Sequence, residues 1–151
     1  MNLIKLELYN ICLEYVSERI KNSEDAIEAA RESSVDDTKS SAGDKYETTR
    51  EMMQQEMDRH QVQLVESRKL KGILSSIDLN KPTTGKVELG SLVQTTIGTF
   101  FIAVSKGQIS LDDKIYFAIS SASPLGQKLI HQSVGTKFDL NGKQVVIMAI
   151  D

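Results

Sequence analysis

The chain has few of the residues that cross-link a fold through disulfides, and it has no long apolar stretch that would anchor it in a membrane. It has a single cysteine, Cys12, among 151 residues, so an internal disulfide is excluded and a reducing compartment is expected. No stretch approaches the roughly 18 apolar residues that a transmembrane helix needs. The first residues carry acids too early for a signal peptide and lack a small-residue cleavage site. We therefore expect a cytoplasmic protein that does not associate with membranes, with Cys12 buried as a small hydrophobe.

Proline and glycine are unevenly distributed along the chain. Residues 1–79 contain no proline and two of the nine glycines, whereas residues 80–151 contain both prolines and the other seven. The first part is acidic, with 11 Lys/Arg against 16 Asp/Glu, and the second is slightly basic, with 7 against 5. The net charge of −3 argues against broad nucleic-acid binding through phosphate neutralisation. These patterns predict an α+β protein with two domains, a helical hairpin over residues 1–79 and a β domain over residues 80–151.

Two stretches of the first domain carry a coiled-coil pattern, in which seam residues recur in alternating steps of three and four. The seam of the first stretch consists of Leu6, Tyr9, Leu13, Val16, Ile20, Ser23, Ile27 and Ala30. The second stretch starts near residue 42 and has a weaker seam of Met53, Met57, His60, Leu64, Ser67, Leu70, Leu74 and Ile77. Together they predict an antiparallel coiled coil.

The segment between the two stretches is rich in serine, aspartate and glycine. Residues 33–44 lack a periodic apolar residue, which predicts the turn of the hairpin. Four acids lie near this tip, offset by two lysines: Asp36, Asp37, Asp44 and Glu47 against Lys39 and Lys45. Acids at a helical turn often only cap and solubilise it, and this interpretation stays open beside a functional one.

Residues 80–151 predict about five strands and one helix. The expected strands cover residues 86–95, 99–105, 114–120, 137–140 and 143–150. Asn141-Gly142 is a strong signal for a two-residue hairpin turn. Ser123-Pro124 opens the helix, because serine caps well and proline suits the first helical position. We expect this helix to run to about Ser133 and to pack across the sheet.

The sequence contains no recognisable catalytic motif. Glycine-rich phosphate loops, Cys-x-x-Cys and Gly-x-Ser-x-Gly are all missing. His60 has no second histidine nearby to make a metal pair, and Ser123 lies about two helical turns from His131, which is unfavourable for a nucleophile and base. We therefore expect no enzyme activity, no cofactor and no intrinsic metal site.

Three short segments carry a resemblance to a known family. They are Tyr46-Glu-Thr-Thr-Arg50, Val87-Glu-Leu-Gly-Ser91 and Ile119-Ser-Ser-Ala-Ser-Pro-Leu-Gly-Gln-Lys-Leu-Ile130. They resemble, in this order, the stretch after the tip, the opening of the C-terminal domain and the Ser-Pro helix of GreA/GreB-like bacterial transcription elongation factors, the Gre family. The resemblance covers nearly the whole chain.

This resemblance implies an FKBP-like antiparallel β domain that docks on RNA polymerase, here through Ala122, Ser123, Pro124 and Leu125. It also implies a coiled coil that enters the secondary channel of the polymerase. In the family, two acids at the tip help the polymerase to hold a second Mg²⁺ and a water that cleaves backtracked RNA. The factor itself is not an enzyme, and it meets DNA and RNA only within the elongation complex.

The tip departs from the family pattern. Alignment on Tyr46 places Lys39 and Ala42 at the two acid positions, so Asp36, Asp37, Asp44 and Glu47 remain as candidates by proximity. We expect a monomeric polymerase-binding factor that stimulates transcript cleavage weakly or not at all.

Three other interpretations remain open. The protein could occupy the channel and modulate or inhibit transcription without cleavage. It could be a structural or dimerising coiled-coil protein, which predicts self-association. An FKBP-like domain could also be a prolyl isomerase, but that activity needs an aromatic-lined pocket, and adjacent Phe100 and Phe101 must face opposite sides of a strand.

Overall fold

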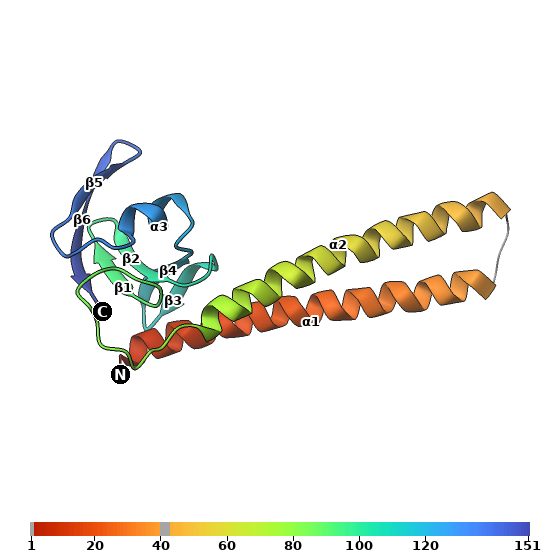
Figure 1. Cartoon of the computed structure of the whole chain (residues 1–151), viewed down its shortest axis with the longest axis horizontal. Coiled ribbons are helices and arrows are strands. Elements are labelled where there is room, and N and C mark those ends of the chain that lie inside the picture. The colour runs from red at the N-terminus through yellow and green to blue at the C-terminus, as the bar shows by residue number, and fades with distance from the viewer. Residues whose placement is uncertain (1, 40–42) are drawn as a thin grey trace. The chain divides into compact units, whose positions relative to one another are not determined.

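A computed structural model of the chain contains two long helices followed by a sheet with one short helix (Figure 1). It describes the backbone of residues 2–39 and 43–151 and the side chains of residues 2–33 and 48–151. The elements are α1 (Leu3–Lys39), α2 (Gly43–Ser75), β1 (Leu92–Thr95), β2 (Gly98–Ile102), β3 (Gly107–Leu111), β4 (Lys114–Ile119), α3 (Pro124–Leu129), β5 (Lys137–Leu140) and β6 (Lys143–Ile150). The predicted α+β class is confirmed. Within the described ranges, no helix combines the length and apolarity needed to cross a bilayer.

The chain forms two compact units. Residues 16–71 make one unit, and residues 1–15 together with 72–151 make the other. Helices α1 and α2 therefore contribute to both units. The expected division between residues 79 and 80 concerns independent folding, and it stays a prediction.

Helices α1 and α2 pack together as an antiparallel pair in the unit of residues 16–71 (Figure 1). On α1 the buried seam residues are Val16, Ser23, Ile27 and Ala30. On α2 the predicted seam residues are the least exposed positions of their turns: Met53, Met57, His60, Leu64, Ser67 and Leu70. Arg68 Nη2 lies 3.7 Å from Glu24 Oε1 and links the two helices at the surface. The predicted coiled-coil seam is thus confirmed in this unit.

The break between the two long helices falls inside the segment predicted as the turn. Helix α1 continues to Lys39, well into the serine- and aspartate-rich segment, and α2 begins at Gly43, close to the expected start. Serine, threonine and aspartate each cost less than about 0.7 kcal/mol relative to alanine inside a helix. A short run of them therefore does not stop a helix, and glycine first occurs at residue 43. The expected capping serines, Ser40 and Ser41, lie outside the described residues.

The seam prediction is wrong for the first turns of α1. The fully buried residues there are Leu8 and Cys12, whereas Leu6, Tyr9 and Leu13 are only half-buried. Residues 3–15 belong to the same unit as the sheet, so their buried face is set by the sheet as well as by a helix. A contact of this kind joins Lys106 Nζ to the Tyr15 ring, 5.2 Å from its centroid. The expected burial of Cys12 is confirmed.

The strands form one mixed sheet in the order β3-β4-β2-β1-β6-β5. The expected antiparallel sheet of about five strands is wrong in two respects, because β2 and β4 run parallel and β3 was missed. The parallel pairing and the missed strand have one cause. The chain turns back through β3 before β4, so β4 enters the sheet beside β2 in the same direction. The β3–β4 turn uses Asp112 and Asp113 at φ 50° and 61°, a left-handed conformation that aspartate tolerates.

The core lies between α3 and one face of the sheet. It consists of Val87, Val93, Phe100, Ile102, Leu129 and Ile147. Phe100 stacks on Phe117 with ring centroids 5.6 Å apart. A bulge in β6 keeps this face apolar: Gln94 pairs with Ala149 and Thr95 with Ile147, so the intervening Met148 is left unpaired and 48% exposed.

The chain after α3 turns away earlier than expected. Helix α3 ends at Leu129 instead of near Ser133, and His131 adopts φ 67°. The backbone groups of residues 131 and 132 are used elsewhere, because His131 N donates to Val87 O at 2.7 Å and Val87 N donates to Gln132 O at 2.8 Å. The predicted Asn141-Gly142 hairpin turn is confirmed, with φ 52° and 84°.

Candidate partner-binding site

The Ser-Pro segment is a tightly hydrogen-bonded turn that leads into α3. Ser123 caps the helix, since its Oγ accepts from Gly126 N at 3.1 Å, and Pro124 occupies the first helical turn. The same hydroxyl donates to Ser120 O at 2.7 Å. Ser120 Oγ in turn accepts from Ala122 N and Ser123 N at 3.2 and 3.1 Å. Two serine side chains therefore fix the backbone of the whole segment.

Gly126 is required by this turn for lack of space. A Cβ atom at residue 126 would overlap the carbonyl oxygen of Ser120 and would lie 2.9 Å from Ser123 Oγ. Sequence reasoning missed the joint role of Ser120, Ser123 and Gly126. The detectable signal was their regular spacing of three residues, which places them around one turn.

The four expected partner-binding residues divide into two pairs. Ala122 and Pro124 are exposed, whereas Ser123 and Leu125 are half-buried. Leu125 packs against the apolar core, and the Ser123 hydroxyl donates its only proton to Ser120 O and accepts from Gly126 N. The surface that this turn offers to a partner is therefore formed by Ala122 and Pro124, supported from beneath by the other two.

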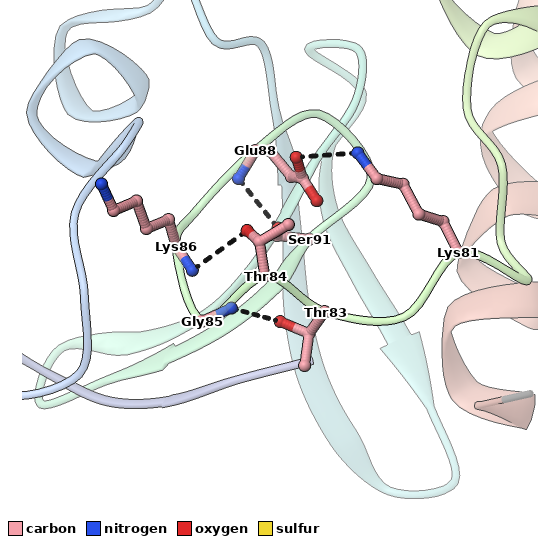
Figure 2. A network of polar contacts seen from close by, with 7 residues as sticks. All are labelled: Lys81, Thr83, Thr84, Gly85, Lys86, Glu88 and Ser91. Atoms are coloured by element: carbon pink, nitrogen blue, oxygen red, sulfur yellow. Dashed lines mark hydrogen bonds and ion pairs between the residues drawn. The ribbon is translucent and has the colours of Figure 1, made fainter.

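Residues 87–91 are hydrogen-bonded to the residues that follow α3, and Figure 2 shows the polar contacts of Glu88 and Ser91 in this segment. Val87 is fully buried and is held by the hydrogen bonds to residues 131 and 132. Glu88 N donates to Ser91 Oγ at 2.9 Å, and Lys81 Nζ pairs with Glu88 Oε2 at 3.2 Å. Gly90 adopts φ 90°, and a Cβ there would lie 2.8 Å from Ile77 Cγ2. The structure thus brings together two of the segments that carried the resemblance.

Lys5 is a partly buried lysine in the neighbourhood of this segment. Burial lowers the pKa of its ammonium group, and the carboxylates of Asp151 and Glu88 oppose this shift. Together with Ser76, Asp78, Lys81 and Ser91, these three residues line a cavity of about 270 Å³.

The candidate acids of the tip lie on the ends of the two long helices. Asp36 and Asp37 belong to the last turn of α1, and Asp44 and Glu47 to the first turns of α2. Their side chains lie outside the described residues, so their role stays a prediction. Among the side chains that are described, no group of three or more His, Cys, Asp or Glu is arranged to hold a metal ion.

The chain matches no family model. It also matches none of the curated proteins.

Proposed function

We propose that this protein is an RNA polymerase-binding elongation factor of the Gre type, with an FKBP-like β domain. The observation that carries the proposal is the combination of a long antiparallel helical pair with an α+β unit whose Ser-Pro turn is rigidly built. The three segments quoted above are distributed over both parts in the order that the resemblance requires.

The dimensions of the helical pair suit insertion into a narrow channel. Residues 16–39 of α1 form 24 residues of the hairpin unit, which is about 36 Å at 1.5 Å per residue. Two packed helices are about 20 Å across. The hairpin enters the secondary channel of the polymerase, and the protein acts there as an occupant and not as an enzyme. Such a partner places the protein in the cytoplasm.

The β domain anchors the complex in this proposal. It carries the slight positive balance of residues 80–151, which suits an acidic partner surface. Ala122 and Pro124 are the exposed part of the turn, and they contact the polymerase directly.

A pull-down with purified core RNA polymerase tests the anchor. Ala122→Glu places a charge on the contact surface, and we expect it to reduce capture at least tenfold. Ser110→Glu is the matched control, because it adds the same charge at an exposed position of β3, and capture should be unchanged. No capture of the unmodified chain, or equal loss with both variants, contradicts the proposal.

A cleavage assay on a backtracked elongation complex tests the tip. We expect channel binding with little release of short 3′ RNA, because Lys39 and Ala42 stand at the positions of the family's acids and a nearby ammonium repels Mg²⁺. Rapid release that is abolished by Asp37→Ala or Asp44→Ala would instead assign a shared Mg²⁺ to these carboxylates.

Self-association is the second candidate function, as a dimerising coiled-coil protein. The observation that favours it is an exposed apolar pair on α2, where Val62 is 63% and Val65 51% exposed. Light scattering of the full chain separates the two candidates: a monomer at micromolar concentration supports the channel factor, and a stable dimer supports the coiled-coil protein.

A further inference from the structure

The sheet face opposite α3 contains a hollow of about 420 Å³ at the first turn of α1. Its lining includes Asn2 and Ile4 from the start of the chain and Leu92 and Ala149 from the strands. This volume falls within the range of about 300–1,000 Å³ typical of small-molecule sites. All of these residues belong to the unit that contains the sheet.

Four polar side chains converge on this hollow from three neighbouring strands. Gln94 of β1 pairs directly with Thr99 of β2. Thr99 lies beside Tyr116 of β4, because the next residues, Phe100 and Phe117, are aligned in the parallel pair. Lys114 precedes Tyr116 by two residues and therefore faces the same side of the sheet. All four residues line the hollow.

None of these four side chains has a hydrogen-bond partner among the described residues. Tyr116 is only 6% exposed as a residue, but its hydroxyl is not among the buried atoms without a partner, so the hydroxyl keeps contact with solvent where it lines the hollow. The phenol, two further hydrogen-bonding groups and a lysine thus surround one space without being used by the fold.

The neighbouring cavity of about 270 Å³ differs from this hollow, because its charged groups have partners within the protein. Its charged groups are used by the protein itself, because Lys81 pairs with Glu88 at 3.2 Å and Glu88 N donates to Ser91 Oγ (Figure 2). The polar groups at that cavity therefore connect segments of the chain to one another. The four polar side chains that line the hollow with Tyr116 have no such partners among the described residues.

The charges around the hollow favour an anion. Lys114 is exposed at its rim and makes no ion pair within the described chain. The N-terminal end of α1 adds the positive end of a helix dipole, and Asn2 caps this end by accepting from Ile4 N at 2.9 Å. The one acid in the lining, Asp151, interacts with the charge of Lys5, so Lys114 is left as the uncompensated charge.

We propose that this hollow is a binding site for a small organic carboxylate. Lys114 and Tyr116 hold the carboxylate group, Gln94 and Thr99 bind polar groups on the remainder, and Leu92 and Ala149 contact its apolar part. This site is separate from the Ser-Pro turn, so it does not depend on polymerase binding.

An NMR titration of the full ¹⁵N-labelled chain tests the site, with sodium benzoate as the probe at constant ionic strength. We expect saturable shifts of the Gln94, Thr99, Tyr116 and Ala149 amide signals. Benzyl alcohol, which lacks the charge, should bind at least tenfold more weakly. Phenyl phosphate separates the two anion chemistries: saturable binding of phenyl phosphate without binding of benzoate overturns the carboxylate assignment.

Three variants connect the binding to the named groups. Tyr116→Phe removes only the hydroxyl and Lys114→Gln only the charge, and we expect each to weaken benzoate at least fivefold. Lys137→Gln is the matched control, because Lys137 is an exposed lysine on β5, and the Kd should not change. No saturable shift at the four amides, or equal weakening in all three variants, overturns the proposal. The spectrum of each variant without ligand shows that it is folded.

Discussion

Ser67 offers a test of the helical pair that runs against the usual effect of a core substitution. It occupies the seam of α2 and is 1% exposed. Its hydroxyl has no hydrogen-bond partner among the described residues. A buried hydroxyl without a partner loses its bonds to water on folding and receives nothing in return. Replacement by alanine should therefore stabilise the protein.

The magnitude follows from three contributions. Removing an unsatisfied buried polar group recovers about 1–3 kcal/mol, and alanine is a better helix former than serine by about 0.5 kcal/mol. The void left by one oxygen atom offsets this by roughly 0.3 kcal/mol at about 24 cal/mol per Å³. We expect Ser67→Ala to raise the free energy of unfolding by about 2 kcal/mol, a rise of about 4–8 °C in Tm for a chain of this size.

Ser17→Ala is the matched control, because Ser17 lies inside α1 but is exposed. It should show only the helix-propensity gain of about 0.5 kcal/mol. Urea unfolding followed by the helical circular dichroism signal measures both variants. If Ser67→Ala gains no more than Ser17→Ala, the Ser67 hydroxyl is satisfied in solution and the reasoning is refuted.

Three further predictions concern how substitutions of Gly126, Ser123 and Cys12 change the stability of the protein. Gly126→Ala should destabilise the protein by more than about 2 kcal/mol in urea unfolding, since the added Cβ overlaps Ser120 O. Gly72→Ala is the control: no atom lies within 4 Å of its Cβ, and it should stabilise the protein by up to about 1 kcal/mol. Equal effects of the two substitutions would contradict the packing at Ser120. Ser123→Ala removes a helix cap and should cost about 1 kcal/mol, with Thr at residue 123 restoring most of it; no loss would show that the cap is dispensable. Burial raises the pKa of the Cys12 thiol from 9.0 to about 11. Between these pH values the folded chain binds a proton that the unfolded chain has lost, so the free energy of unfolding falls as pH rises from 9 to 11. Cys12→Ala should abolish this fall in a pH series of urea midpoints.

The sequence predicted the helical pair well where one rule governs burial. Among the described residues of the 16–71 unit, each helix packs against the other, and the alternating steps of three and four located Ile27 and Leu64 correctly. In the first turns of α1 the same rule selected Leu6 and Leu13, but Leu8 and Cys12 are buried. A helix that also faces a sheet has a second buried direction, and no heptad pattern encodes it.

The sheet was predicted less completely because its pairing is non-local. The alternation of Ile109 and Leu111 with polar residues was present in the sequence, but Asp112-Asp113 is a weaker turn signal than Asn141-Gly142. Without β3, the parallel pairing of β2 with β4 could not be anticipated. The hollow was also invisible in the sequence, since Gln94, Thr99 and Tyr116 become neighbours only through strand register.

The construction of the Ser-Pro turn bears on how a partner would recognise it. The only proton of the Ser123 hydroxyl is donated to Ser120 O, and Leu125 packs against the apolar core, so a partner could not use this donor or the Leu125 side chain without breaking an existing contact. In the proposed complex, a partner would therefore meet a surface of Ala122 and Pro124 that is already formed before binding. Ordering a flexible loop costs affinity on association, and a pre-formed turn avoids that cost. In this chain Ser123 and Gly126 hold the turn on which the exposed Ala122 and Pro124 lie, so in the proposed complex their role is to position the contact surface.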